Sequence, residues 1–166
     1  MQNQIKFNIA KIYHKLGYDE KTDYLYLNVR YGLKAVKGDL TEPVAERIYY
    51  EGDIVKVDES WGITYPSSQW IPAPYVFDIV IWLKNNFNII IEPILENQTW
   101  TYKIYFPELF LELELDKDLE NEEITDKGLT SIYDNKFLTI EKLFEHVVNE
   151  IAITADKNNW YEKLNL

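Results

Sequence analysis

The expected fold depends on the stretch Tyr75-Val76-Phe77-Asp78-Ile79-Val80-Ile81-Trp82-Leu83-Lys84-Asn85-Asn86, which lies near the middle of a chain of 166 residues. Pro72-Ala73-Pro74 comes directly before it, and proline is well tolerated in the first turn of a helix. On a helix, the apolar residues of this stretch would cover most of the circumference, leaving only Asp78, Lys84 and Asn85 at an outer edge. We therefore predict a largely buried helix lying across a sheet. A strand remains the alternative, because short apolar runs rich in β-branched residues do not separate the two.

A hairpin is predicted directly after this helix. Ile89 to Leu95 and Trp100 to Tyr105 are two apolar stretches joined by Glu96-Asn97-Gln98-Thr99. Pro93 cannot donate a hydrogen bond to a neighbouring strand, so its strand should lie at a sheet edge or carry a bulge there.

More strands are predicted before the helix. Residues Tyr24 to Tyr31 alternate between apolar and more polar side chains, which indicates a strand with one face on the core. Ile48-Tyr49-Tyr50 and Ile54-Val55-Lys56-Val57 flank Gly52-Asp53 and predict a second hairpin. The stretch from Trp61 to Trp70 contains glycine, proline and serine and is predicted to be a loop.

Helices are also predicted near both ends of the chain. Residues Gln4 to Leu16 carry isoleucine and leucine at helical spacing, and Gly17 stands where a C-terminal cap belongs. Thr139 to Ile151 shows a similar stripe, and the tail that follows offers Trp160, Tyr161 and Leu164 for docking onto the body. The order of elements predicts an α+β fold, with one domain over residues 1–166 and three helices packed on a mostly antiparallel sheet.

Composition narrows the class of protein. A hydrophobic fraction of 46% and an aromatic fraction of 15% argue against general disorder. No apolar run approaches the ~18–20 residues of a membrane span, and the N-terminus lacks the pattern of a signal peptide. The chain has no cysteine, which excludes disulfides, thiolate zinc sites and cysteine nucleophiles. The default expectation is a cytoplasmic protein without membrane contact.

Most of the net charge of −11 lies in residues 108–127, called here the acidic segment. From Glu108 to Asp126 there are nine acids and one base, Lys117, which gives −8. Its first half alternates leucine with acidic residues and predicts a strand with the acids facing outward; Asp116 to Gly128 is predicted to be an exposed loop or a frayed helix. Such concentrated charge must be solvated, or matched by a cation or a basic partner.

Three patches of the sequence resemble an uncharacterised family of small proteins from phages, prophages and Bacteroidota. The first is Ile9-Ala10-Lys11-Ile12-Tyr13-His14-Lys15-Leu16-Gly17-Tyr18-Asp19-Glu20. The second is Ala73-Pro74 followed by Ile81-Trp82-Leu83-Lys84-Asn85-Asn86-Phe87-Asn88-Ile89, and the third is Phe137-Leu138-Thr139-Ile140-Glu141-Lys142-Leu143-Phe144. Together they cover about a quarter of the chain and exclude the acidic segment. The resemblance implies a phage or mobile-element origin and supplies no activity.

Catalytic and cofactor motifs are missing from the sequence. The six glycines are isolated, so no phosphate-cradling motif is present, and no serine lies in a nucleophile elbow. His14 is expected on the helix surface, and His146 is expected to form an ordinary surface ion pair with Glu150 rather than a metal site. We therefore expect a protein that is not an enzyme and has no cofactor and no metal site.

Carboxylates leave two alternatives open. The acids from Asp116 to Glu122 resemble an EF-hand loop, but the required glycine and bidentate glutamate are replaced by Asn121 and Lys127. Paired carboxylates could also serve a small carbohydrate-acting or metal-dependent enzyme. A solvated sheet edge remains the plain structural alternative.

The leading hypothesis is a protein-binding role for the acidic segment. Few arginines and a pI of about 4.6 argue against direct nucleic-acid binding. Instead, the acids could imitate a nucleic-acid backbone and occupy a basic groove on a host defence protein, such as a CRISPR effector, which would make this an anti-CRISPR-like inhibitor. Exposed aromatic residues, such as Trp61, Trp70 or Trp160, could add anchors, or could instead mediate self-association. The predicted contact residues are Glu112, Glu114, Asp116, Asp118, Glu120, Glu122 and Glu123.

Overall fold

The computed structural model describes residues 4–28, 33–36, 46–56, 70–107, 122–125 and 128–163. The chain has helices and antiparallel sheets, so the predicted α+β class is confirmed. It divides into two compact units, Gln4–Pro74 and Tyr75–Leu166. A single domain over residues 1–166 stays a prediction, because two compact units can belong to one domain. Within the described ranges, no helix combines the length and the apolar content that crossing a membrane requires.

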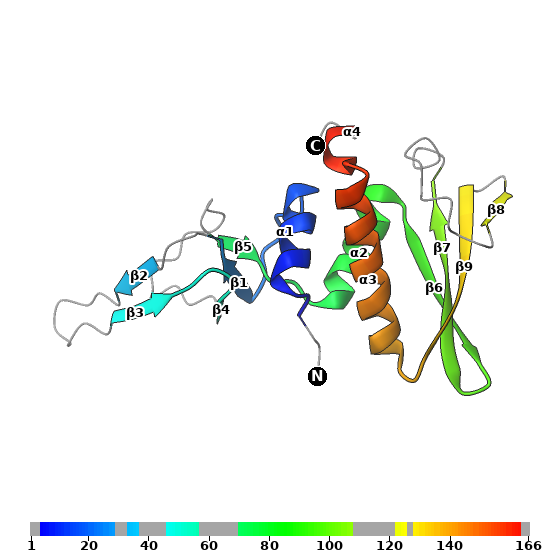
Figure 1. Ribbon diagram of the computed structural model, residues 1–166, viewed down its shortest axis with the longest axis horizontal. Helices are drawn as coiled ribbons and strands as arrows, with labels where there is room; N and C mark the ends of the chain where they lie inside the picture. Colours follow the sequence, from blue (N-terminus) through cyan, green and yellow to red (C-terminus); the bar gives the residue numbers. More distant parts are fainter. Residues whose placement is uncertain are drawn as a thin grey trace. The chain divides into compact units, whose positions relative to one another are not determined.

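The first unit begins with α1 (Phe7–Lys15), which packs against β5 (Trp70–Pro72) (Figure 1). Ile5 and Ile9 are buried, as the predicted apolar stripe requires. Gly17 follows the helix at φ +92°, a conformation that glycine adopts without steric cost, so the predicted C-terminal cap is confirmed. The N–H of Ile5 donates to the carbonyl of Pro74 at 3.1 Å, which ties the start of the unit to its end.

Strand β1 (Tyr24–Leu27) lies between β4 (Ile54–Lys56) and β5 in a three-stranded antiparallel sheet. It ends at Leu27, and residues 29–31 of the predicted strand lie outside the described residues. Both of its faces are covered. Leu25 and Leu27 are fully buried, whereas Tyr26, on the opposite face, donates its hydroxyl to the carbonyl of Ile5 at 2.7 Å. The sequence predicted one face on the core; the second face is covered as well because Ile5 and Phe7, around the start of α1, contact Tyr26.

The predicted hairpin around Gly52-Asp53 was also wrong. A tight turn is present, with Gly52 at φ +85° and the N–H of Asp53 donating to the carbonyl of Tyr50 at 2.9 Å. However, β3 (Glu46–Tyr49) pairs with β2 (Leu33–Val36), while β4 pairs with β1. The turn therefore passes the chain from one sheet to another. The predicted loop from Trp61 to Trp70 lies outside the described residues except for Trp70, which begins β5.

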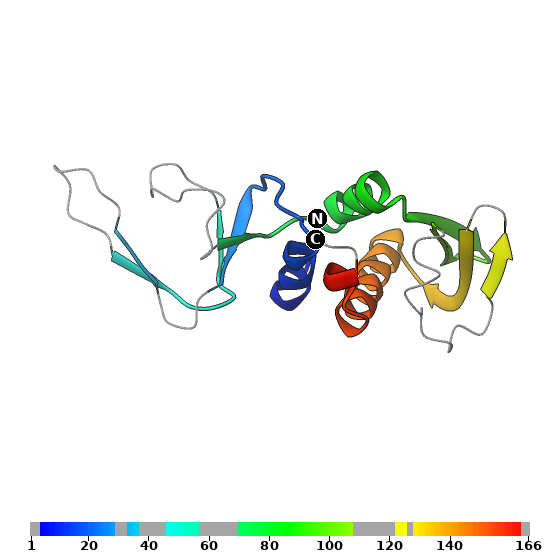
Figure 2. The same cartoon turned by 90° about the horizontal axis from the view of Figure 1, so that it is seen from above.

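The second unit contains a four-stranded antiparallel sheet in the order β6-β7-β9-β8. Its strands are β6 (Ile90–Glu96), β7 (Thr99–Phe106), β8 (Glu122–Thr125) and β9 (Gly128–Phe137). Helix α2 (Val76–Phe87) precedes the sheet, and α3 (Ile140–Lys157) and α4 (Trp160–Lys163) follow it. Figure 2 shows α2 and α3 on the same side of the sheet, where α3 packs against β7 and β9 and α2 packs against α3.

Helix α2 forms as predicted but is less buried than predicted. Val76, Ile79, Trp82 and Leu83 are buried on one side, whereas Ile81 remains 58% exposed. The apolar residues surround the helix, but α3 and β6 cover only part of its circumference. One side of the helix is therefore buried and the other is exposed, although apolar residues lie on both sides.

The hairpin β6–β7 is confirmed, and β6 is an edge strand, as Pro93 predicted. Asn97 and Gln98 form its two-residue turn with φ values of 48° and 67°, which matches the twist of paired strands. Helix α3 begins as predicted, with the Thr139 hydroxyl accepting from the N–H of Lys142 at 3.3 Å, but continues to Lys157. Strand β9 was not predicted, and it separates β7 from β8.

Candidate functional site

The acidic segment connects two strands of the four-stranded sheet. Five of the seven predicted contact residues lie outside the described residues: Glu112, Glu114, Asp116, Asp118 and Glu120. The other two, Glu122 and Glu123, belong to β8, opposite Ser131 and Thr130 of β9. The prediction of a loop or frayed helix was therefore wrong for 122–125, where pairing with the unpredicted strand β9 imposes extended structure. The predicted leucine and acid strand from Leu109 to Leu115 lies outside the described residues.

Both ends of the acidic segment lie at the same end of this sheet. Strand β7 ends at Phe106, which is in register with Leu129 of β9, and Leu129 is in register with Ile124 of β8. Neighbouring strands are ~4.7–4.9 Å apart, so β7 and β8 are separated by about twice that spacing. The last described residues before the segment, in β7, and the described residues Glu122 to Thr125, in β8, therefore lie two positions apart in the same sheet.

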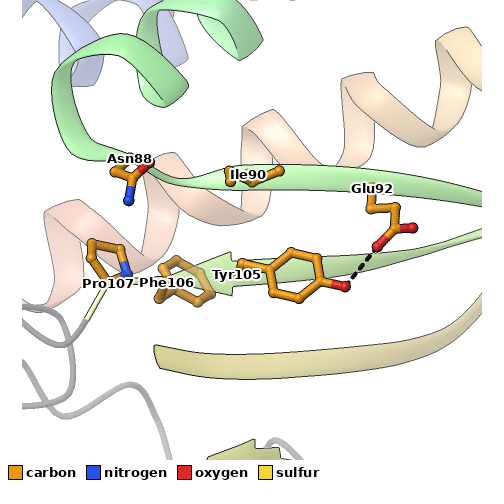
Figure 3. A pocket seen from close by; sticks show the side chains of 6 residues that line it. All are labelled: Asn88, Ile90, Glu92, Tyr105, Phe106 and Pro107. Atoms are coloured by element: carbon orange, nitrogen blue, oxygen red, sulfur yellow. Dashed lines mark hydrogen bonds between the residues drawn. The ribbon is translucent and has the colours of Figure 1, made fainter. Parts of the chain in front are cut away.

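A pocket of about 530 Å³ lies at this end of the sheet. Three segments supply its walls: the turn after α2, strand β6, and the end of β7 (Figure 3). The lining residues are Asn88, Ile90, Glu92, Tyr105, Phe106 and Pro107. Because Pro107 is the last residue before the acidic segment, the pocket directly adjoins the start of that segment.

The polar centre of the pocket is a hydrogen bond between two side chains. The Tyr105 hydroxyl donates to Oε2 of Glu92 at 2.6 Å (Figure 3). In the sheet register Glu92 stands opposite Lys103, and Tyr105 opposite Ile90, so this is a diagonal pair across the hairpin. The hydrogen bond to the Glu92 carboxylate, its negative charge and some burial together raise the pKa of Tyr105 above its ordinary value of 10.0. Tyr105 therefore remains a hydrogen-bond donor at neutral pH.

The rest of the pocket is mostly apolar. Ile90 is 39% exposed, and Phe106 is buried. Asn88 has φ 54° and ends α2 in the left-handed conformation that asparagine tolerates. This cap redirects the chain from the helix into β6, and Asn88 lines the pocket together with Ile90 and Glu92 of that strand (Figure 3).

Two of the three predicted aromatic anchors are buried. Trp70 is 4% exposed and Trp160 is 2% exposed. Trp160 instead docks the tail, with its ring 6.5 Å from that of Phe106 in an edge-to-face arrangement, which confirms the predicted docking of this residue. Trp70 and Trp160 therefore cannot anchor a partner, and Trp61 lies outside the described residues.

Each of the two histidines contacts other residues of the fold. His14 is half-buried rather than exposed, and its Nδ1 lies 3.2 Å from the carbonyl oxygen of Tyr18. His146 stacks obliquely on Phe137, with ring centroids 5.0 Å apart. Over the part of the chain that the structure describes, no group of three or more histidine, aspartate or glutamate side chains could hold a metal ion.

Comparisons with protein-family models, curated proteins and solved structures return no match. The pocket therefore has to be interpreted from its own chemistry. The pairing of Glu92 with Tyr105 could have been predicted from the sequence. A two-residue turn at Asn97-Gln98 fixes the register of the hairpin, and this register brings the two side chains onto one face. Asn88 could not be found in this way, since its place depends on how α2 ends.

Proposed function

We propose that this is a non-enzymatic binding protein that captures a basic protein through its acidic segment. The observation that carries the proposal is the attachment of this segment to the four-stranded sheet at both ends, after Phe106 and at Glu122. The negative charge from Glu108 to Asp126, −8 in total, is thereby attached to a folded body on both sides. A partner could then contact several carboxylates at once.

A nucleic-acid-binding protein is the proposed class of partner. Such proteins carry Lys and Arg along the path of the phosphate backbone, and closely spaced carboxylates offer them an alternative anion. A host defence protein, such as a CRISPR effector, is the specific proposal, and its support is the resemblance of three sequence patches to phage and prophage proteins. Inhibition would then result from occupying the basic groove.

The test is a pull-down from a host lysate at low and high salt with a charge-neutralised variant. The seven predicted contact acids are changed to their amides in that variant. The wild type should capture a nucleic-acid-binding protein at low salt and lose it at high salt, because salt screens exposed charges beyond about 10 Å at 0.1 M. The variant should fold normally and capture nothing.

A matched control separates the acidic segment from overall charge. Seven exposed acids elsewhere are changed in the control: Asp19, Glu20, Asp23, Glu96, Glu141, Glu150 and Glu162. Both variants have a net charge of −4, since seven negative charges are removed from −11. Capture by the control but not by the first variant supports the proposal. Equal capture by both variants would contradict it, and a melting temperature raised by Ca²⁺ or a saccharide would favour a carboxylate enzyme instead.

A further inference from the structure

We propose that the pocket where β6 begins and β7 ends receives an arginine side chain of the basic partner. This inference rests on the proposed function, because it names a specific contact within the same interaction. Glu92 would bind the guanidinium group, and the Tyr105 ring would lie against its plane.

The carboxylate of Glu92 is suited to this role. The Tyr105 hydroxyl donates to one of its oxygens, Oε2, and holds the side chain along the pocket (Figure 3). An ionised carboxylate offers about four acceptor sites, so one hydrogen bond leaves capacity for a donor from a partner. A guanidinium group presents its donors in a planar fork that matches a carboxylate better than the single ammonium of lysine does.

The walls of the pocket suit the rest of an arginine side chain. Tyr105 offers a ring face, on which guanidinium groups stack by cation–π attraction. Ile90 and Pro107 supply apolar surface for the methylene stem, which long basic side chains bury while the charge stays at a polar group. The acids that begin at Glu108, directly after Pro107, add an attractive potential for a cation at long range.

Lys103 opposes this binding and gives the inference a second test. It stands directly opposite Glu92 in the register, so its side chain lies on the same face of the hairpin. The short hydrogen bond shows that the Glu92 carboxylate turns toward the diagonal Tyr105. Replacing Lys103 with glutamine should therefore strengthen binding of a cation, by about two- to fivefold for one screened charge near the surface.

The experiment measures binding of a capped Gly-Arg-Gly peptide to the full chain by chemical shifts of backbone amides. The control peptide contains citrulline, which has nearly the shape of arginine but no charge. We expect saturable shifts at Ile90, Glu92 and Tyr105 with the arginine peptide, and roughly tenfold weaker binding of the citrulline peptide, as for the loss of one charge-assisted hydrogen bond. Equal binding of the two peptides, no shifts at the pocket, or equal binding of a lysine peptide would overturn the assignment.

Two variants test the roles of the central pair. Glu92→Gln should lose roughly tenfold in affinity for the arginine peptide, and Tyr105→Phe should lose less because the ring remains. Glu92 is exposed and Tyr105 is half-buried, and unchanged amide shifts away from the pocket will show that each variant is folded. If Glu92→Gln binds as tightly as the wild type, the pocket does not bind arginine through its carboxylate.

The lysate experiment separates failure of this inference from failure of the proposed function. Capture that is lost in the seven-acid variant and weakened in Glu92→Gln supports both. Capture that is lost in the seven-acid variant and unchanged in Glu92→Gln overturns the arginine pocket and leaves the proposed function intact. Capture that persists in the seven-acid variant overturns the proposed function, whatever Glu92→Gln does.

Discussion

The two faces of the β6–β7 hairpin differ in what covers them, although each residue on one face is a chain neighbour of a residue on the other. On the face toward α3, Ile91 is 8% exposed, Ile104 2% and Tyr102 0%. On the pocket face, Ile90 is 39% exposed, and Glu92 and Tyr105 make their hydrogen bond at the surface. A change of one residue position therefore separates a core residue from a binding-site residue, because successive side chains of a strand point to opposite faces.

The largest expected effect is on the covered face. Ile104→Ala should lower the free energy of unfolding by about 2–5 kcal/mol, because it removes buried methyl and methylene groups and leaves a cavity beneath α3. Ile90→Ala makes the same chemical change on the pocket face and should cost about 1 kcal/mol or less. Urea denaturation of both variants measures the difference. Equal losses would mean that the two faces are covered alike.

A smaller effect is expected at the turn that sets which residues share a face. Gln98 has φ 67°, which is unfavourable for a side chain with a Cβ atom. Gln98→Gly should therefore raise the free energy of unfolding by about 0.5–1 kcal/mol, whereas Thr101→Gly, within β7, should lower it by a similar amount. Thermal denaturation of the two variants tests this. A destabilising Gln98→Gly would show that the turn is not held in the left-handed conformation.

The smallest expected effect concerns the pH dependence of the pocket face. The pKa of Tyr105 is raised chiefly by its hydrogen bond to the Glu92 carboxylate, so Glu92→Gln should bring it back toward 10.0. Since the folded-state pKa is the higher one, this hydrogen bond contributes its stability below about pH 10 and loses it as the pH rises through the raised pKa. Ring carbon shifts of Tyr105 followed across alkaline pH measure both titrations, and the same midpoint in wild type and variant would contradict the assigned cause.

Local sequence was sufficient where an element depends on its own neighbours. The stripe of α1, the cap at Gly17, and the hairpin around Asn97 and Gln98 each depend on residues within a few positions along the chain. The edge position of β6 also followed from Pro93, because a missing N–H is tolerated best at an edge. These features are confirmed because their energetics are local.

Strand partners could not be predicted, since they depend on contacts far apart in the sequence. The turn at Gly52 was recognisable, but β3 pairs with β2 and β4 pairs with β1, and no local pattern distinguishes these pairings from a hairpin. Strand β9 has mixed composition from Gly128 to Phe137 and is stabilised by two neighbouring strands rather than by its own pattern. The burial of Trp70 and Trp160 could not be predicted either, because it depends on packing against residues distant in the sequence.

The sequence by itself determined the α+β class, the main helices and the concentration of negative charge between Glu108 and Asp126. These depend on composition and on periodicity along the chain, which burial of an apolar stripe requires. Only the tertiary structure decided that β9 lies between β7 and β8, and that the acidic segment begins beside a pocket centred on Glu92 and Tyr105. The reason is that pairing and pocket formation bring together residues distant in the chain, and the free energy of those contacts is absent from any local pattern.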